Sequence, residues 1–177
     1  MVDVVVADDA GWDRDLLAGV REMTFAAFEG RFDEHDWAHT LGGLRVVALA
    51  DGVPVAAGAV VPRTLLVGER EIHAGYVEGV ATAGDRQGGG FGTAVMRAVA
   101  EVVRDRYELG ALSTSAHGFY ERLGWERWQG PTFVRDGEMV VRTEVEDDGI
   151  MVLRHGPSAE LDPTQPLTCE ARPGDDW

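Results

Sequence analysis

The sequence predicts an α/β protein with a mixed central β-sheet flanked by helices, and three observations favour this class. Short runs rich in Val and Ala alternate with longer runs whose apolar residues recur at helical spacing. Turn pairs such as Asp51-Gly52 separate neighbouring extended runs, as hairpins require. A glycine-rich turn between Thr82 and Thr93 separates an extended run from a long apolar-periodic one. Strands and helices that alternate in this way are expected to form a sheet with helices on its faces.

The first part of the chain is expected to form a strand, two helices and a hairpin. The helix that begins near Asp33 has Trp37 and Leu41 on one face, and Gly42-Gly43 ends it. The expected elements, in order, are a strand at Val2–Ala7, helices at Trp12–Phe28 and Asp33–Leu41, and a hairpin of Leu44–Ala50 with Val53–Val61.

The remaining elements are shorter, apart from one long strand and one long helix. They are strands at Thr64–Val67 and Glu71–Thr82, a helix at Gly88–Arg104, a strand at Leu109–Ser113, a helix at Ala116–Leu123, a strand at Trp125–Trp128, a hairpin at Pro131–Val141, an acidic loop at Glu144–Gly149 and a strand at Ile150–Arg154. The segment 156–177 is rich in Pro, Asp and Gly and shows no periodicity, so we expect an irregular tail. We expect one domain over residues 1–177.

Composition and charge narrow the class of protein. Hydrophobic residues make up 45% of the 177 residues, enough for a core. The net charge of −15 would repel nucleic acid and anionic membranes and attract cationic ligands. The alternative is that this charge only keeps the protein soluble. The start lacks the basic region of a signal peptide, and no apolar run approaches the roughly 20 residues that span a bilayer. The single Cys169 excludes an internal disulfide framework and agrees with the cytoplasm.

The glycine-rich turn is a candidate phosphate site. A helix that opens on glycines leaves N–H groups free at its positive end, where phosphates can approach the backbone closely. The stretch Gln87–Gly92 fits the pattern Gln/Arg-x-x-Gly-x-Gly, and it fits neither the P-loop nor the dinucleotide fingerprint. The alternative is a plain glycine turn.

Strand, turn and helix together resemble the coenzyme A site of the GNAT N-acetyltransferases. Further collinear matches resemble one GNAT subfamily, the aminoglycoside 2'-N-acetyltransferases, at Asp36–Gly43, Gly75–Ala81, Leu109–Ser113 and Gly174–Trp177. The resemblance implies the GNAT fold, acetyl-CoA as cofactor and a homodimer. It implies that Val80, Ala81 and Thr82 pair with the pantetheine arm. The pyrophosphate would lie on Gln87, Gly88, Gly89, Gly90, Phe91, Gly92 and Thr93.

The resemblance assigns the acid and base roles to Glu78 and Tyr120. Glu78 would act through a water as the base, because an ammonium must lose a proton before it attacks a thioester. Tyr120 would protonate the departing thiolate, although the chain is slightly shorter than the family between Ser113 and Tyr120. The backbone N–H of Val80 would polarise the thioester carbonyl. Two alternatives stay open: Glu78 as an electrostatic anchor for a cation, and Tyr120 as a core aromatic residue.

The resemblance also implies a set of residues that bind the substrate. It contains Asp36, Glu78, Gly79, Ser113, Glu146, Asp147, Asp175 and Trp177, the last through its carboxylate as well. Several convergent carboxylates suit a polycationic sugar. One match fails, because Arg31 in Gly30-Arg31-Phe32 stands where the family has an acidic residue. Arg31 therefore brings a cation to a substrate position.

Three functions follow from these observations. The first is acetylation of the 2'-amine of aminoglycoside antibiotics, a resistance activity. The second is acetylation of another cationic amine, such as a polyamine, a peptide or a biosynthetic amino sugar, and Arg31 favours it. The third is an acyl-CoA-binding module without turnover, against which the presence of both Glu78 and Tyr120 argues. No metal site is expected, since His35 and His39 share helical spacing but have no evident third ligand.

Overall fold

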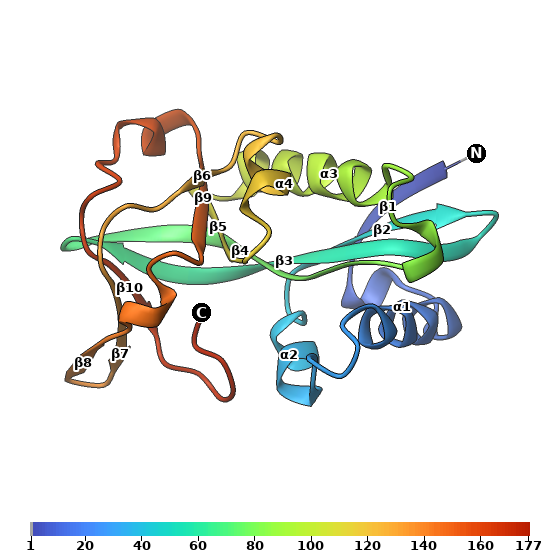
Figure 1. The fold of residues 1–177 in the computed structure, drawn as a ribbon, viewed down its shortest axis with the longest axis horizontal. Helices are drawn as coiled ribbons and strands as arrows, with labels where there is room; N and C mark the ends of the chain where they lie inside the picture. The colour runs from blue at the N-terminus through green and yellow to red at the C-terminus, as the bar shows by residue number, and fades with distance from the viewer. Residues whose placement is uncertain (1) are drawn as a thin grey trace. The chain divides into compact units, whose positions relative to one another are not determined.

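The computed structural model describes residues 2–177 (Figure 1). These residues divide into two compact units. The first unit comprises the chain up to Val61 together with Val77–Val102, and the second comprises Pro62–Tyr76 and Val103–Trp177. The two long strands β3 (Val53–Val67) and β4 (Arg70–Thr82) are each divided between the two units. None of the helices within residues 2–177 has the length and apolar character that crossing a membrane requires.

In the first unit, β1 (Val2–Asp8) pairs antiparallel with β2 (Leu44–Ala50) along its whole length. β2 in turn pairs antiparallel with the first part of β3, as the predicted hairpin requires. Asp51 and Gly52 form the turn with positive φ angles of 53° and 80°, which Asp tolerates and Gly favours. The hairpin prediction is confirmed.

The helices of the first unit begin where acidic residues cap them. Asp13 accepts hydrogen bonds from the N–H groups of the first turn of α1 (Arg14–Ala27), and Asp33 does the same for α2 (Glu34–His39). Val20 of α1 is fully buried and packs with Val47 and Ala57 of the sheet. Short 3-10 turns lie at Asp9–Gly11 (η1) and Gly84–Arg86 (η2).

The long helix α3 (Phe91–Arg106) begins at Phe91, so the predicted start at Gly88 is wrong. Gly88 and Gly90 have φ angles of 78° and 82°, which lie outside the right-handed helical region. The glycines that mark the turn therefore also delay the helix. Val95 and Met96 on its inner face are fully buried.

The second unit contains a mixed sheet, which confirms the predicted class. The strand order is β6 (Glu126–Arg127), β9 (Ile150–Arg154), β5 (Leu109–Ser113), β4, β3, β10 (Leu167–Glu170), β7 (Thr132–Asp136) and β8 (Met139–Arg142). β4 and β5 are parallel, with pairs from Ala74↔Leu109 to Tyr76↔Ala111. Along the chain, three short helical segments separate strands of this unit: α4 (His117–Glu121), η3 (Glu144–Glu146) and η4 (Gly156–Glu160).

Two sequence predictions are corrected in these strands. The tail 156–177 is not wholly irregular, because β10 lies between β3 and β7 and buries Leu167 and Cys169. β10 has only four residues, too few for the alternation of apolar and polar residues that marks a strand in the sequence. β3 also continues past Pro62, where a break was expected. Pro62 lies beyond the last β2 pair at Val60 and before the first β10 pair at Leu65, so its missing N–H disrupts neither ladder.

Candidate active site

Gly79 produces an irregularity near the C-terminal end of β4. Its φ angle is +58°, which residues with a side chain rarely adopt inside a strand. A Cβ atom there would lie 2.9 Å from Cγ2 of Thr40 and 3.5 Å from Cζ of Phe32. The residues on both sides, Glu78 and Val80, are half-buried. A break of this kind redirects the neighbouring side chain and N–H groups, which is how strands present functional residues.

The glycine-rich turn that follows β4 is exposed and has no side chains over much of its backbone. A Cβ atom on Gly89 would lie 2.7 Å from the Phe91 ring and 3.1 Å from the Arg86 carbonyl oxygen. Ala94 N–H donates to the Gly90 carbonyl at 3.0 Å in the first turn of α3, and Gly89 N–H donates to the Arg86 carbonyl at 3.3 Å. The first N–H groups of any helix have no partner within the helix. Backbone N–H groups of glycines at a helix start, which carry no Cβ atoms of their own, fit a phosphate group.

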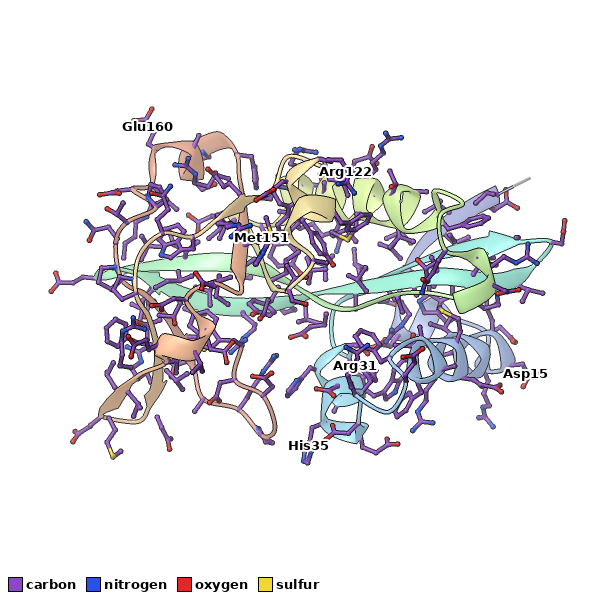
Figure 2. All side chains as sticks on the ribbon, viewed as in Figure 1. Asp15, Arg31, His35, Arg122, Met151 and Glu160 are labelled. Carbon is purple, nitrogen blue, oxygen red and sulfur yellow. The ribbon has the colours of Figure 1, made fainter. Side chains whose placement is uncertain are left out.

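Two of the predicted substrate residues lie near α2 in the first unit. Asp36 is half-buried, and its Oδ2 accepts a hydrogen bond from the Asp33 N–H at 2.8 Å, which closes a capping box. Arg31 is exposed (Figure 2). Its Nε donates to the Phe28 carbonyl at 3.3 Å. Asp36 therefore has a structural role whether or not it binds a substrate.

In the second unit, Ser113 is exposed at the end of β5 and Tyr120 is buried on α4. Tyr120 is 8% exposed, and its ring packs edge-on against Phe119 and Trp125 at 5.0 and 6.3 Å. Burial raises the pKa of the Tyr120 hydroxyl to about 12. The phenol therefore keeps its proton at neutral pH. This arrangement suits a proton donor and also the core role that the sequence left open.

Glu146 and Asp175 bring two negative charges together. Glu146 is half-buried, and its pKa is raised first by burial and then by repulsion from the Asp175 carboxylate. Carboxylates that repel one another are stabilised by a cation between them. The pair is therefore suited to an ammonium group.

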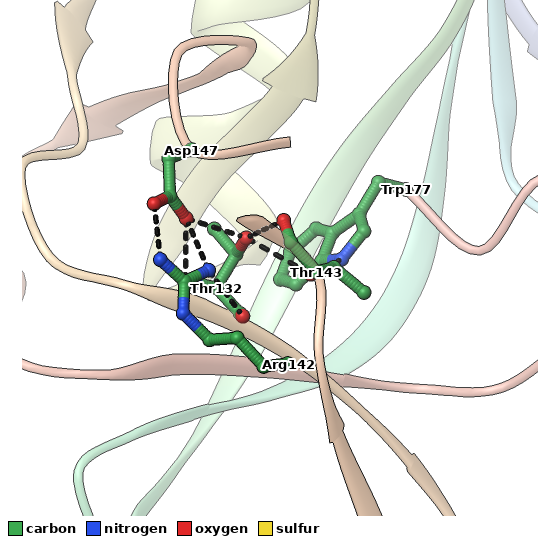
Figure 3. A network of polar contacts seen from close by, with 5 residues as sticks. All are labelled: Thr132, Arg142, Thr143, Asp147 and Trp177. Carbon is green, nitrogen blue, oxygen red and sulfur yellow. Dashed lines mark hydrogen bonds and ion pairs between the residues drawn. The ribbon is translucent and has the colours of Figure 1, made fainter. Parts of the chain in front are cut away.

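Asp147 differs from Glu146, although the two are adjacent in the chain. The Arg142 guanidinium and the Thr132 backbone and hydroxyl groups bind the Asp147 carboxylate, with Thr132 N and Oγ1 both 2.9 Å from Oδ1 (Figure 3). Arg142 is the largest of the causes that lower the pKa of Asp147 to about 2. The charge of Asp147 is thus already balanced by a cation of the protein.

The same network reaches Trp177. Its indole Nε1 donates to Thr143 Oγ1 at 3.1 Å, and Thr143 Oγ1 donates to Thr132 Oγ1 at 2.9 Å (Figure 3). Trp177 is only 4% exposed. Asp147 therefore supports the position of Trp177 through two threonines.

The comparisons with known proteins concern the family and the fold. The family model described as "Acetyltransferase (GNAT) domain" matches residues 17–128. An aminoglycoside 2'-N-acetyltransferase of Mycolicibacterium fortuitum is 46% identical over 169 residues, which cover 93% of this chain and 87% of that protein. The chain belongs to the aminoglycoside 2'-N-acetyltransferase family of GNAT acetyltransferases. The predicted family is confirmed.

Solved structures of other GNAT proteins share the fold of this acetyltransferase. The GNAT N-acetyltransferase YhbS of Escherichia coli, solved with CoA, has a TM-score of 0.68 at 14% identity, with 95% of this chain and 89% of that chain covered. A GNAT acetyltransferase of Brucella melitensis, solved with acetyl-CoA, has a TM-score of 0.61 at 20% identity, with 93% and 94% covered. At these identities the likeness confirms the fold class.

The sequence analysis of this acetyltransferase missed Arg142, which binds the predicted site residue Asp147, and Arg63, which binds the neighbour of Asp175. Arg142 lies in β8 and pairs with Asp147. Arg63 lies in β3 and donates to the carbonyl oxygen of Asp176, next to Asp175. An acidic residue near an arginine in sequence is a weak hint for the first contact. No local pattern indicates the second, because its partners lie more than a hundred positions apart in the chain.

Proposed function

We propose that the protein transfers the acetyl group of acetyl-CoA to the 2'-amine of aminoglycosides, by direct attack in a ternary complex. The observation that carries the proposal is the 46% identity, over 93% of the chain, to a protein of that name. Glu146 and Asp175 support it, because their mutual repulsion favours a cationic ligand. The formal charge of −15 favours the approach of a polycation as well.

The proposed cofactor site lies on β4 and the glycine-rich turn. Acetyl-CoA supplies an activated acetyl thioester. The N–H groups of Gln87–Thr93 would hold its pyrophosphate, and the close contacts that a Cβ atom on Gly89 would make explain a glycine there. Val80–Thr82 would pair with the pantetheine arm as an added strand. The irregularity at Gly79 would turn the Val80 N–H toward the thioester carbonyl.

For the chemical step we propose Glu78 as base and Tyr120 as acid. Glu78 would accept, through a water, the proton that the attacking ammonium must lose. Tyr120 would hold the proton destined for the departing sulfur. The raised pKa of Tyr120 supports this role, because the hydroxyl remains protonated throughout the neutral range.

The proposed acceptor site uses side chains of two kinds. Glu146 and Asp175 would bind ammonium groups directly, and Asp36, Gly79 and Ser113 would contact the sugar. Asp147 would act mainly through its support of Trp177, because Arg142 already balances its charge. Arg31 is the feature that favours a different cationic amine as the acceptor.

We also propose a cytoplasmic homodimer. A single cysteine, Cys169, forms no internal disulfide, as is usual in a reducing compartment, and burial raises its pKa to about 11, so the thiol stays protonated. Exposed apolar side chains on β8, at Met139, Val140 and Val141, are candidates for a subunit contact. Sedimentation of the purified chain tests the dimer.

A substrate panel tests the proposed activity. Aminoglycosides with a 2'-amine and matched ones with a 2'-hydroxyl are each incubated with acetyl-CoA, and products are located by mass spectrometry. We expect acetylation at the 2'-amine alone, since a hydroxyl is a far weaker nucleophile. Acetylation of another amine, or of polyamines and peptides but no aminoglycoside, would replace the proposal by the second function. If the protein binds acetyl-CoA but releases no thiol with any amine tested, the third function, an acyl-CoA-binding module without turnover, would replace the proposal.

A further inference from the structure

We propose that Arg63 is a positioning residue for the acceptor site, which it serves by tying the terminal loop (residues 171–177) to β3. This inference rests on the proposed function, in which Asp175 binds the acceptor. Arg63 is half-buried, and its Nη1 donates to the Asp176 carbonyl at 2.8 Å while its Nη2 donates to the Glu170 carbonyl at 3.0 Å. The Glu170 carbonyl is the last of β10, directly before the loop, and the Asp176 carbonyl lies near the end of the loop. One guanidinium thus closes the loop.

The geometry of these contacts requires an arginine. The guanidinium is planar and presents donors in a fixed fork, so it binds two carbonyls at once, whereas a lysine ammonium is a single point charge. The Glu170 carboxylate does not compete for Arg63, because Arg135 Nε donates to its Oε1 at 2.7 Å. Cys169 Sγ lies 3.3 Å from the Asp176 carbonyl that Arg63 also contacts. Arg63 therefore acts on the loop backbone.

The aromatic ring of Tyr76 packs against the Arg63 guanidinium. Its side chain is 1% exposed, and the Arg63 guanidinium carbon lies 4.7 Å from the centre of its ring. The guanidinium carbon of Arg172, a residue of the terminal loop, lies 5.6 Å from the same ring. Two cations over one aromatic ring gain from its negative face. The ring therefore helps to hold both the strand and the loop in one arrangement.

Within the loop, Asp175 is held from both sides. Arg172 Nε donates to the Asp175 carbonyl at 2.7 Å, and the Trp177 N–H donates to Asp175 Oδ1 at 3.2 Å. These bonds are internal to the loop and do not connect it to β3. Arg63 supplies that connection, while Ala171 N–H and Trp177 Nε1 attach the two ends of the loop to Arg135 and Thr143. Removal of Arg63 would therefore leave the ends attached and loosen the stretch around Asp175 and Asp176. Asp175 would then no longer be fixed beside Glu146, whose raised pKa reports their proximity.

The kinetic test compares Arg63→Met, Arg63→Lys and the control Arg70→Met. Arg70 forms an exposed ion pair with Glu108 at 3.3 Å, so its loss removes an arginine without touching the terminal loop. For Arg63→Met we expect the KM for a 2'-amino aminoglycoside to rise about 10–100-fold, as for a lost hydrogen bond of a charged group. The KM for acetyl-CoA should stay within about twofold. Arg63→Lys should recover little, and the control should match wild type.

Hydrogen exchange supplies a readout that needs no acceptor. In Arg63→Met the amides of peptide 171–177 should exchange faster than in wild type and in Arg70→Met, while the melting temperature shows that the protein is folded. Unchanged exchange in a folded Arg63→Met protein overturns the tie. Faster exchange without a rise in acceptor KM overturns the link to the acceptor. If wild type acetylates no aminoglycoside, the proposed function fails, and the exchange result alone supports or overturns the tie.

Discussion

A Cβ atom on Gly79 would lie 2.9 Å from Cγ2 of Thr40, closer than such atoms approach in folded proteins. The same residue has a φ angle of +58°, so both the space and the backbone conformation require glycine. Thr40 cannot easily move, because it is 2% exposed and its Oγ1 accepts a hydrogen bond from Arg45 Nη2 at 2.9 Å. The buried Thr40 side chain therefore leaves room only for a glycine at position 79, beside Glu78.

Gly79→Ala should lower both stability and turnover. The added methyl group must displace Thr40 and adopt a left-handed conformation, which together cost about 1–3 kcal/mol. Denaturant unfolding and kcat measure the two effects. Gly84→Ala is the control, because a Cβ atom there meets nothing within 4 Å. Equal stability of the two variants would show that the packing around Gly79 is looser than the structure indicates.

Glu78→Gln should reduce kcat by about 10²–10⁴-fold at neutral pH, as expected for loss of a general base. The amide keeps the shape of the side chain but cannot accept a proton. The deficit should shrink as the pH rises, because more of the acceptor amine is then unprotonated. Rates across pH 6–10 measure this, and wild-type turnover at pH 7 rules out the assignment. If Glu78 instead anchors a cation, KM rises more than kcat falls.

Tyr120→Phe should lower kcat and should also change the alkaline stability. The folded-state pKa of Tyr120 is about 12 and its ordinary value is 10. A raised pKa stabilises the fold fully below pH 10, and this contribution is lost as the pH rises toward 12. The variant should therefore lose less stability than wild type between pH 10 and 12. Unchanged kcat would reduce Tyr120 to a core residue, and parallel alkaline denaturation curves would contradict its raised pKa.

Asp147→Asn should destabilise the protein at pH 7 by about 1 kcal/mol, after allowance for partial exposure of the pair with Arg142. The pKa of Asp147 is about 2 in the fold against 3.8 ordinarily. Its stabilisation is therefore present above pH 4 and is lost as the pH falls through 2. The difference between variant and wild type should vanish near pH 2. A constant difference down to that pH would mean that hydrogen bonding, and not charge, holds the loop.

The sequence was sufficient to predict those elements whose signals are local. Leu44–Ala50, Leu109–Ser113 and Ile150–Arg154 are strands with the predicted bounds, because each is a short apolar run between turn residues. β10 was missed because its strand character comes from its neighbours β3 and β7 and not from its own four residues. Local patterns cannot show a partner that is distant in sequence.

The candidate site divides in the same way. The glycine-rich turn and Glu78 lie in one continuous stretch, so their pattern is visible without a structure. Arg63 and Arg142 were missed because their roles depend on contacts with the terminal loop and with Asp147. The distinction between Asp147 and Glu146 was also hidden, since both are acidic residues of one loop. Their neighbours show the difference: Arg142 balances the charge of Asp147, whereas Asp175 repels that of Glu146.

This distinction leads to the sharpest prediction about the acceptor site, which concerns Glu146→Gln. Burial and the nearby Asp175 raise the pKa of Glu146, so the fold binds its proton more tightly than the unfolded chain does. The ionised carboxylate therefore costs stability above that raised pKa, and the cost is absent at lower pH. Without ligand, Glu146→Gln should melt at a higher temperature than wild type at pH 7, and this advantage should disappear as the pH falls below 4.

The same variant should bind the acceptor more weakly. Loss of one of two carboxylates around an ammonium should raise the acceptor KM about 3–10-fold at low salt and less at high salt, because salt screens the remaining charge. Asp147→Asn is the matched control, since it removes a neighbouring charge that Arg142 already balances and should lower the melting temperature instead. A gain in stability with a loss of acceptor binding identifies Glu146 as a ligand residue. If Glu146→Gln is less stable and binds normally, the carboxylate serves the fold alone.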